Sequence, residues 1–211
     1  MSANDLALTS EGLAPEGRGR VLVIACGALA REVLAVREAN GLKHLDVQCL
    51  PAILHNRPDR IAPALEGAVE AARGRYHAVF VAYGDCGTGG ELQRTCERLG
   101  VAMIEGPHCY SFFEGNEAFA RRDEATAFYL TDFLARQFDA FVWRPLGLDR
   151  HPELRDMYFG NYETLVYQAQ TDDPQLTETA RSCAARLGLA FERRFTGYGD
   201  LGRVLGTLAG S

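Results

Sequence analysis

The stretch Ala78-Val79-Phe80-Val81-Ala82-Tyr83-Gly84-Asp85-Cys86-Gly87-Thr88-Gly89-Gly90 joins an apolar run to a glycine-rich turn, and the helix-like segment 91–99 follows it. A short continuous apolar run is typical of a strand buried in a parallel sheet. The order of strand, turn and helix places Cys86 at the carboxyl end of the strand, where open α/β sheets bind their ligands. This turn is therefore the centre of the predicted functional site.

Two further stretches repeat this order, and each also ends close to a cysteine. They are Val21-Leu22-Val23-Ile24-Ala25-Cys26-Gly27 and Val101-Ala102-Met103-Ile104-Glu105-Gly106-Pro107-His108-Cys109. The apolar patterns predict strands at 20–26, 46–51, 76–83 and 101–105, with helices at 28–40, about 59–73 and 90–99. This alternation predicts an α/β fold with a doubly wound, mostly parallel, Rossmann-like sheet. Right-handed crossovers place the carboxyl ends of these strands on one edge.

The domain organisation follows from the same patterns. We expect a flexible N-terminal tail over 1–19 and a single α/β domain over 20–211. An aromatic-rich segment interrupts the alternation and predicts a helical insertion over about 110–162, with a long helix at 124–138. The α/β pattern then returns, with a strand or a helix end at 163–168, a helix at 174–187, a strand at 189–195 and a helix at 200–208.

Charge and composition exclude several classes of protein. The net charge is −6 and the basic residues are scattered, which argues against nucleic acid and against an anionic membrane surface as partners. The sequence has no apolar run of the ~20 residues that a membrane span needs, and its first twenty residues do not resemble a secretory signal. Six cysteines in such a chain predict reduced thiols in the cytoplasm.

The cysteines fall into two groups. Cys49, Cys96 and Cys183 lie inside amphipathic or apolar segments and are expected in the core. The others, Cys26, Cys86 and Cys109, lie at strand-to-turn junctions. Zinc is held by thiolate and imidazole ligands, so we expect a metal site made of Cys26, Cys86 and either His108 or Cys109. The alternative is a set of buried free thiols.

The glycine-rich turn permits other interpretations. A thiol at a helix N-terminus has a lowered pKa, so Cys86 is also a candidate nucleophile or redox centre without a metal. Gly84 and Gly87 are candidate cofactor-binding positions, although the turn lacks the Gly-Lys-Ser/Thr ending of a phosphate loop. Asp85 is either a general base or positioning group for the thiols, or the N-cap of the following helix.

Two short motifs supply further candidate residues. In His55-Asn56-Arg57-Pro58, Arg57 is placed to hold a substrate carboxylate or phosphate and Asn56 to bind a cofactor. The alternative is a helix cap at Asn56 and a surface charge at Arg57. In Trp143-Arg144-Pro145, the cation Arg144 beside Trp143 clamps an anionic ligand or stacks within the core.

Seven short motifs occur along the chain: Cys26-Gly27, His55-Asn56-Arg57-Pro58, Tyr83-Gly84-Asp85-Cys86-Gly87, His108-Cys109-Tyr110, Thr131-Asp132-Phe133, Trp143-Arg144-Pro145 and Asn161-Tyr162. Taken together, they resemble the domain of unknown function 1638 family over nearly the whole chain from about residue 20. Members of that family occur in bacteria and methanogenic archaea. The resemblance implies an association with corrinoid-dependent methyltransferase systems for methylamines and betaines.

The resemblance and the cysteines together lead to one expected function. We expect a zinc protein that acts on a small-molecule substrate in corrinoid- or folate-linked methyl transfer, with a corrinoid or tetrahydrofolate as a candidate substrate. Zinc keeps a thiol ionised and nucleophilic near neutral pH. Asp85, Arg57 and Arg144 are the expected catalytic residues. The alternatives are a non-enzymatic module that docks on a corrinoid protein or methyltransferase through the aromatic segment, and a metal-free thiol enzyme.

Overall fold

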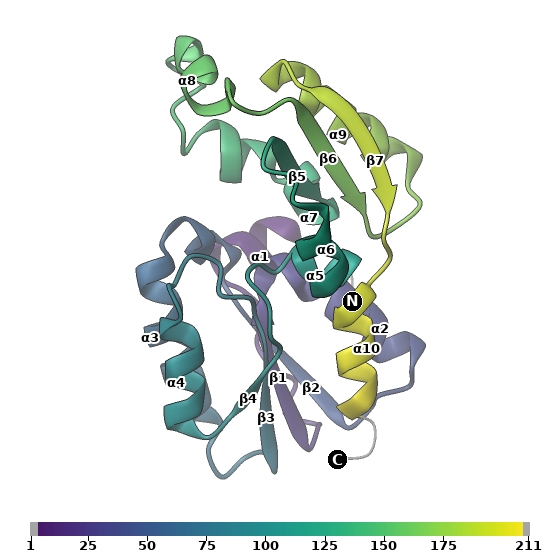
Figure 1. Ribbon diagram of the computed structural model, residues 1–211. Helices are drawn as coiled ribbons and strands as arrows, with labels where there is room; N and C mark the ends of the chain where they lie inside the picture. The colour runs from purple at the N-terminus through teal and green to yellow at the C-terminus, as the bar shows by residue number, and fades with distance from the viewer. Residues whose placement is uncertain (1–3, 209–211) are drawn as a thin grey trace. The chain divides into compact units, whose positions relative to one another are not determined.

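The predicted strands are divided between two separate all-parallel sheets in the computed structural model, which describes residues 4–208 (Figure 1). The chain forms two units. Unit 1 holds the chain up to Phe112 and again from Tyr198 onward, and unit 2 holds Phe113–Gly197. The α/β class with parallel strands is therefore confirmed, while the second half of the pattern builds a sheet of its own.

Unit 1 is built on a four-stranded sheet with the order β2-β1-β3-β4. All six residues of the central strand β1 are buried, which explains its uninterrupted apolar run. The register pairs Val21 with Leu45 on one side and with Ala78 on the other. The strands are β1 (Val21–Cys26), β2 (Leu45–Leu50), β3 (Ala78–Ala82) and β4 (Ala102–Met103).

Helices cover both faces of this sheet, as in other doubly wound folds. Figure 1 shows α3 and α4 side by side on one face and α2 and α10 on the other. This arrangement leaves the carboxyl ends of β1 and β3 to be covered by turns. The helical elements of unit 1 are α1 (Asp5–Ser10), η1 (Gly27–Leu29), α2 (Ala30–Ala39), η2 (Ala52–Asn56), η3 (Pro58–Arg60), α3 (Ile61–Ala72), α4 (Glu91–Leu99), α5 (Ser111–Glu114, which extends into unit 2) and α10 (Gly199–Thr207).

Unit 2 has a three-stranded sheet with the order β5-β6-β7. β6 is the middle strand, and five of its six residues are buried. The elements are α6 (Asn116–Arg122), β5 (Ala127–Thr131), α7 (Asp132–Arg136), the π-helical turn η4 (Asp139–Trp143), η5 (Pro152–Leu154), α8 (Arg155–Phe159), β6 (Thr164–Ala169), α9 (Pro174–Leu187) and β7 (Ala190–Phe195).

The aromatic residues of unit 2 mostly form its core. Phe133 packs edge-on against Phe141, with ring centroids 5.4 Å apart, and Phe128 packs in the same way against Phe159 at 5.2 Å. Such edge-to-face pairs add to the stabilisation from burial. The aromatic run that predicted an insertion is thus the apolar content of a second small core.

Two segments differ from the sequence-based expectation. The region 124–138 was expected as one long helix, but it consists of β5, which pairs with β6, followed by the short helix α7. The expected tail over 1–19 contains α1, whose Leu8 is only 1% exposed, and Leu13 bridges to Cys49 of β2. In both segments the observed structure includes pairing with a strand that is distant in the sequence. A local sequence pattern carries no information about such pairing. Residues 1–3 lie outside the described part of the chain.

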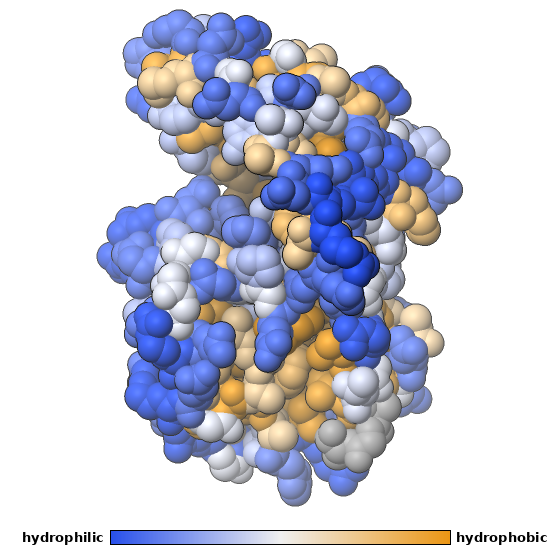
Figure 2. Space-filling view, viewed as in Figure 1, coloured by the Kyte–Doolittle hydropathy of each residue, from blue (hydrophilic) through white to orange (hydrophobic). Residues whose placement is uncertain are grey.

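The surface of unit 1 is uneven in polarity. Figure 2 shows hydrophobic residues gathered over the sheet between α4 and α10, and hydrophilic residues over α3 and α4. Among residues 4–208, no helix is both long enough and apolar enough to cross a membrane.

Candidate functional site

Three thiols and one phenol meet where the strands of unit 1 end. Cys26 is the last residue of β1, Tyr83 directly follows β3, and Cys109 lies beyond β4. The sulfur atoms of Cys86 and Cys109 are 3.3 Å apart, although the two residues are 23 positions apart in the chain. Cys26 interacts in turn with Cys109 and Tyr83. We call Cys26, Tyr83, Cys86 and Cys109 the thiol cluster.

The backbone holds the two halves of this cluster together. The amide of Cys86 donates to the carbonyl of Pro107 at 3.0 Å, and the amide of Asp85 donates to the carbonyl of Gly106 at 3.0 Å. Because both bonds join the turn after β3 to the turn after β4, they continue the contact between these strands beyond the ladder. Cys86 and Cys109 are therefore kept close by the main chain.

The conformation of Cys86 is itself uncommon. Its φ of +47° lies in the left-handed region, which costs a residue with a Cβ about 1–2 kcal/mol. The rest of the turn avoids this strain, because the other residues of the turn with positive φ are the glycines Gly87, Gly89 and Gly90, which have no Cβ. A non-glycine residue held in this conformation is the kind of local strain found at functional sites.

Cys26 is the thiol that its surroundings favour as a thiolate. The hydrogen bond from Cys109 has the largest effect and lowers the pKa of Cys26. Burial opposes this effect, because Cys26 is only 4% exposed, while the Tyr83 hydroxyl and the Ala28 amide lower the pKa further. The donors outweigh burial, so the pKa of Cys26 lies below its ordinary value.

The partners of Cys26 remain protonated. Hydrogen bonding to Cys26 and Cys86, together with burial, raises the pKa of Cys109 well above its usual range. Burial and the neighbouring cysteines raise the pKa of Tyr83 as well. Tyr83 is 1% exposed, and its buried hydroxyl makes no hydrogen bond of ordinary geometry among the described residues, although it is close enough to Cys26 to lower the pKa of that thiol. The cluster thus has one favoured thiolate and two proton donors.

Asp85 shapes the turn. Its carboxylate accepts hydrogen bonds from the Thr88 hydroxyl at 2.6 Å and from the amides of Gly90 at 2.7 Å and Gly89 at 3.2 Å. The bond from Thr88 is the main reason why the pKa of Asp85 is lowered. The carboxylate therefore closes the turn that precedes α4. The N-cap of α4 is Gly90, without a side-chain capping bond, so Asp85 is not the helix cap that the sequence offered as its alternative role.

His108 lies next to the cluster in sequence but has a different partner. Its ring stacks on Tyr110, with centroids 4.8 Å apart and planes 10° apart. Burial lowers the pKa of His108. The pKa of the nearby His55 is also lowered, first by desolvation of its ring and then by the charge of His108. Both imidazoles are therefore favoured in the neutral form, the form that binds metals.

The sulfur atoms do not form a ready metal site. In the part of the chain that the structure describes, no group of three or more His, Cys, Asp or Glu residues is arranged to hold a metal ion. Thiolates and a neutral imidazole are suitable zinc ligands by type. Cys26, Cys86, His108 and Cys109 are therefore ligand types gathered in one region without the convergent geometry of a zinc centre.

The other predicted residues lie elsewhere. Asn56 ends η2, and Arg57 is exposed and pairs with Asp59 at 3.4 Å. Trp143 and Arg144 belong to unit 2. The cation that stacks on Trp143 is the guanidinium of Arg186, 4.2 Å from the ring, while Arg144 is exposed. Trp143 is half-buried, and its stacking partner is one that the motif did not indicate.

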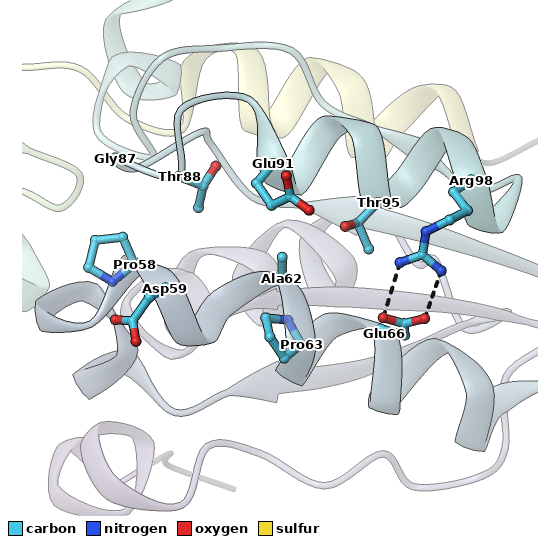
Figure 3. A pocket seen from close by; sticks show the side chains of 10 residues that line it. All are labelled: Pro58, Asp59, Ala62, Pro63, Glu66, Gly87, Thr88, Glu91, Thr95 and Arg98. Atoms are coloured by element: carbon cyan, nitrogen blue, oxygen red, sulfur yellow. Dashed lines mark hydrogen bonds and ion pairs between the residues drawn. The ribbon is translucent and has the colours of Figure 1, made fainter.

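A groove of about 490 Å³ runs between α3 and α4, and Gly87 and Thr88 line one end of it (Figure 3). Arg98 of α4 makes a two-pronged ion pair with Glu66 of α3, at 2.7 and 3.0 Å. This pair crosses the groove and links the two helices. Because Gly87 follows Cys86 directly, the groove adjoins the turn that carries that thiol.

The remaining cysteines are core residues, as the sequence predicted. Cys49, Cys96 and Cys183 are each at most 3% exposed. Burial raises the pKa of Cys96 and that of Cys183 to about 11, and it raises the pKa of Cys49 further. These thiols are held in the protonated form. Ionisation, and not access, distinguishes them from Cys26, which is buried to a similar extent but has a lowered pKa.

Sequence reasoning missed Tyr83 as a site residue. It directly follows an apolar strand and was interpreted as the last residue of that strand. Its position just before the glycine turn was the available signal, because that position places a side chain at the carboxyl end of the sheet.

The docking alternative depended on exposed aromatic residues in 110–165, but the large exposed apolar side chains of that segment are Met157 and Tyr158 of α8.

The fold and the site define a parallel α/β protein with a thiol cluster at the strand ends of its first unit. The model of the family described as "Protein of unknown function (DUF1638)" matches residues 49–205, so the chain belongs to that family. The matched region includes Cys86 and Cys109 and begins after Cys26. No curated protein matches the chain, and no solved structure does.

Proposed function

We propose that the protein is a thiol-dependent enzyme in which the thiolate of Cys26 is the nucleophile. The observation that supports this is the arrangement around Cys26, where the neighbouring Cys109 thiol and Tyr83 hydroxyl lower the pKa of the buried thiol. A thiolate in a nonpolar site needs such donors, because burial alone favours the neutral thiol. The reduced state that this chemistry requires fits the cytoplasm.

Methyl transfer is the reaction that the family resemblance favours. The Cys26 sulfur would attack the methyl carbon of a corrinoid or a folate, forming a carbon–sulfur bond as the bond to the donor breaks. The electron pair of the broken bond stays on the donor. Tyr83 and Cys109 would hold the thiolate before the attack and release it as its charge disappears. A corrinoid protein or a methyltransferase is the partner that this proposal implies.

Zinc binding by the same thiols is the second candidate. The presence of three sulfur atoms at neighbouring strand ends favours it, since thiolates are preferred zinc ligands. The side chains would have to turn to converge on an ion. Elemental analysis after anaerobic purification tests this candidate, with Cys86→Ser and the core variant Cys96→Ser compared side by side. Absence of stoichiometric zinc from the unaltered chain would reject it.

Site-resolved alkylation tests the nucleophile. The chain is treated briefly with iodoacetamide between pH 5 and 10, and the rate at each cysteine is read by peptide mass analysis. We expect Cys26 to reach half of its maximal rate below pH 9. Cys109→Ala, which removes a donor, should shift this midpoint upward, while Cys109→Ser should restore it.

Cys96→Ala serves as the control, because Cys96 lies outside the cluster, against Met103. A Cys26 midpoint at or above pH 9 in the unaltered chain would reject Cys26 as the nucleophile. An identical shift in Cys109→Ala and Cys109→Ser would show that the hydrogen-bond donor is not the cause.

A further inference from the structure

We propose that Cys86 and Cys109 are a reversible redox pair that closes to an intramolecular disulfide. The inference goes beyond the proposed function, because it concerns two thiols other than the proposed nucleophile. Their sulfur atoms lie 3.3 Å apart in the reduced chain. A disulfide bond is about 2.05 Å long, so closure requires the sulfur atoms to approach by little more than one ångström.

The main chain favours this pairing over others. The two hydrogen bonds from residues 85 and 86 to the carbonyls of 106 and 107 fix the turns that carry the two thiols. The amide of Gly84 also donates to the sulfur of Cys109 at 3.3 Å, which holds that side chain toward β3. Small side-chain rotations therefore suffice, and the sheet need not move.

Access distinguishes this pair from the other cysteines. Cys86 and Cys109 are both partly exposed, whereas Cys26, Cys49, Cys96 and Cys183 are buried. An oxidant from solution therefore reaches the pair first. Susceptibility to oxidation follows exposure, and a second thiol nearby directs the product to a disulfide.

The chemistry balances with a hydroperoxide as the oxidant. The sulfur of Cys86, as thiolate, attacks the outer oxygen of the hydroperoxide, and the oxygen–oxygen bond breaks to give a sulfenic acid and an alcohol. The sulfur of Cys109 then attacks the sulfur of Cys86, and water leaves. Two thiols and one hydroperoxide thus give a disulfide, an alcohol and water. A dithiol reverses the reaction by exchange.

Closure would also change the environment of Cys26. The Cys109 thiol donates to Cys26 in the reduced state, and a disulfide sulfur has no proton to donate. Closure of the pair would therefore remove Cys109 as a neighbouring donor of Cys26. This consequence rests on the proposed function, whereas formation of the disulfide does not.

The experiment uses the full chain, reduced and freed of reductant under anaerobic conditions. One equivalent of hydrogen peroxide is added, remaining thiols are blocked with N-ethylmaleimide, and the peptides are mapped without reduction. We expect a linked pair of peptides that contain Cys86 and Cys109, a loss of two of the six free thiols, and full recovery with dithiothreitol. Cys86→Ser and Cys109→Ser should each abolish the link, while Cys96→Ser should retain it.

Three outcomes would overturn the inference. One is a dominant link between Cys26 and Cys109, another is oxidation of Cys86 to a sulfinic acid with Cys109 unchanged, and the third is full retention of free thiols. Equilibration of the unaltered chain in mixtures of reduced and oxidised glutathione gives the same answer without any variant, so a folding defect in the variants leaves the test intact. If the link forms while alkylation of Cys26 is unaffected, the redox pair stands and the donor role of Cys109 toward Cys26 fails; the midpoint of Cys26 alkylation tests the proposed nucleophile separately.

Discussion

The backbone amide of Gly84 donates a hydrogen bond to the sulfur of Cys109 at 3.3 Å, and the two residues are also in close backbone contact. A Cβ at Gly84 would lie 2.7 Å from the nitrogen of Cys109 and 2.6 Å from the carbonyl carbon of His108. Both neighbours are main-chain atoms and cannot move aside cheaply. Glycine at this position is therefore what lets the end of β3 approach the turn that carries Cys109.

Gly84→Ala should disrupt this contact. We expect a loss of about 1–3 kcal/mol in the free energy of unfolding, because the extra methyl group forces the two turns apart. The thiols of Cys86 and Cys109 should react faster with a thiol reagent, since they are no longer held together. Urea unfolding and thiol titration measure the two effects.

Gly67→Ala is the matched control. Gly67 lies within α3, and a Cβ there meets nothing within 4 Å. Alanine in a helix interior is favoured over glycine by about 0.5–1 kcal/mol, so this variant should be more stable and its thiol reactivity unchanged. Equal stability of Gly84→Ala and the unaltered chain would contradict the packing argument.

Tyr83→Phe should slow the reaction of Cys26. The variant removes one hydroxyl donor and retains the buried ring, so the pKa of Cys26 should rise and its alkylation rate at pH 7 should fall several-fold. The rate at pH 10 should change little, because the thiol is then ionised in both proteins. Rates at the two pH values are measured by peptide mass analysis.

Tyr76→Phe separates this effect from a general loss of a tyrosine hydroxyl. The Tyr76 hydroxyl donates to Asp46 at 2.7 Å, and the tyrosine lies in the same unit but outside the thiol cluster. Its removal should leave the Cys26 rate unchanged. If the two variants behave alike, Tyr83 does not act through Cys26.

Much of the fold could be predicted from the sequence, because many of its helices and strands follow from local patterns of apolar and capping residues. The apolar runs at 20–26 and 46–51 and the capped segment 174–187 correspond closely to β1, β2 and α9. The segment 124–138 could not be predicted, because β5 depends on pairing with β6 more than thirty residues away. Its aromatic spacing suits either a helix or a strand, and only the partner strand decides between them.

The site was predictable to the level of the strand ends. The topology rule brought Cys26, Cys86 and Cys109 to one edge, and the structure places these thiols together there. The roles within the cluster were not predictable, since they depend on which donor lies beside which sulfur. The pKa of Cys26 is lowered by Cys109 and Tyr83, which are 83 and 57 positions away in the chain, and no spacing in the sequence indicates those contacts.

The stability of unit 2 should depend on pH through Glu124. Arg194 makes a two-pronged ion pair with Glu124, at 2.8 Å for both contacts, and lowers the pKa of the Glu124 carboxyl to about 2. The pKa in the unfolded chain is about 4.5. Because the folded pKa is the lower one, the stabilisation is complete above pH 4.5 and is lost as the pH falls toward 2.

Glu124→Gln should remove this dependence. We expect the variant to be less stable by about 1–3 kcal/mol at pH 7 and to lose less stability than the unaltered chain between pH 5 and 3. Glu178→Gln is the control, because Glu178 is exposed and pairs only loosely with Arg181 at 3.4 Å. Parallel pH profiles for Glu124→Gln and the unaltered chain would reject the assignment.

Asp132 should be the most sensitive polar position of unit 2. Asp132 is 1% exposed. Its carboxylate accepts hydrogen bonds from the Tyr167 hydroxyl at 2.7 Å and from the Gln170 amide at 3.0 Å. It also accepts from the hydroxyl of Thr171 at 2.6 Å and from the amide of Thr171 at 3.0 Å. These bonds join the end of β5 to the end of β6. Asp132→Asn keeps the size of the side chain but turns one acceptor into a donor that faces the donors of Thr171.

We expect Asp132→Asn to lower the free energy of unfolding of unit 2 by about 2–4 kcal/mol, because a buried donor and its neighbours lose their partners. Trp143 is the single tryptophan of the chain and lies in unit 2, so its fluorescence in urea reports this unit. Asp172→Asn removes an exposed carboxylate that pairs with Arg193 at 2.6 Å and should cost at most about 1 kcal/mol. If the two variants unfold at the same urea concentration, the Asp132 network does not stabilise unit 2 in the way its geometry indicates.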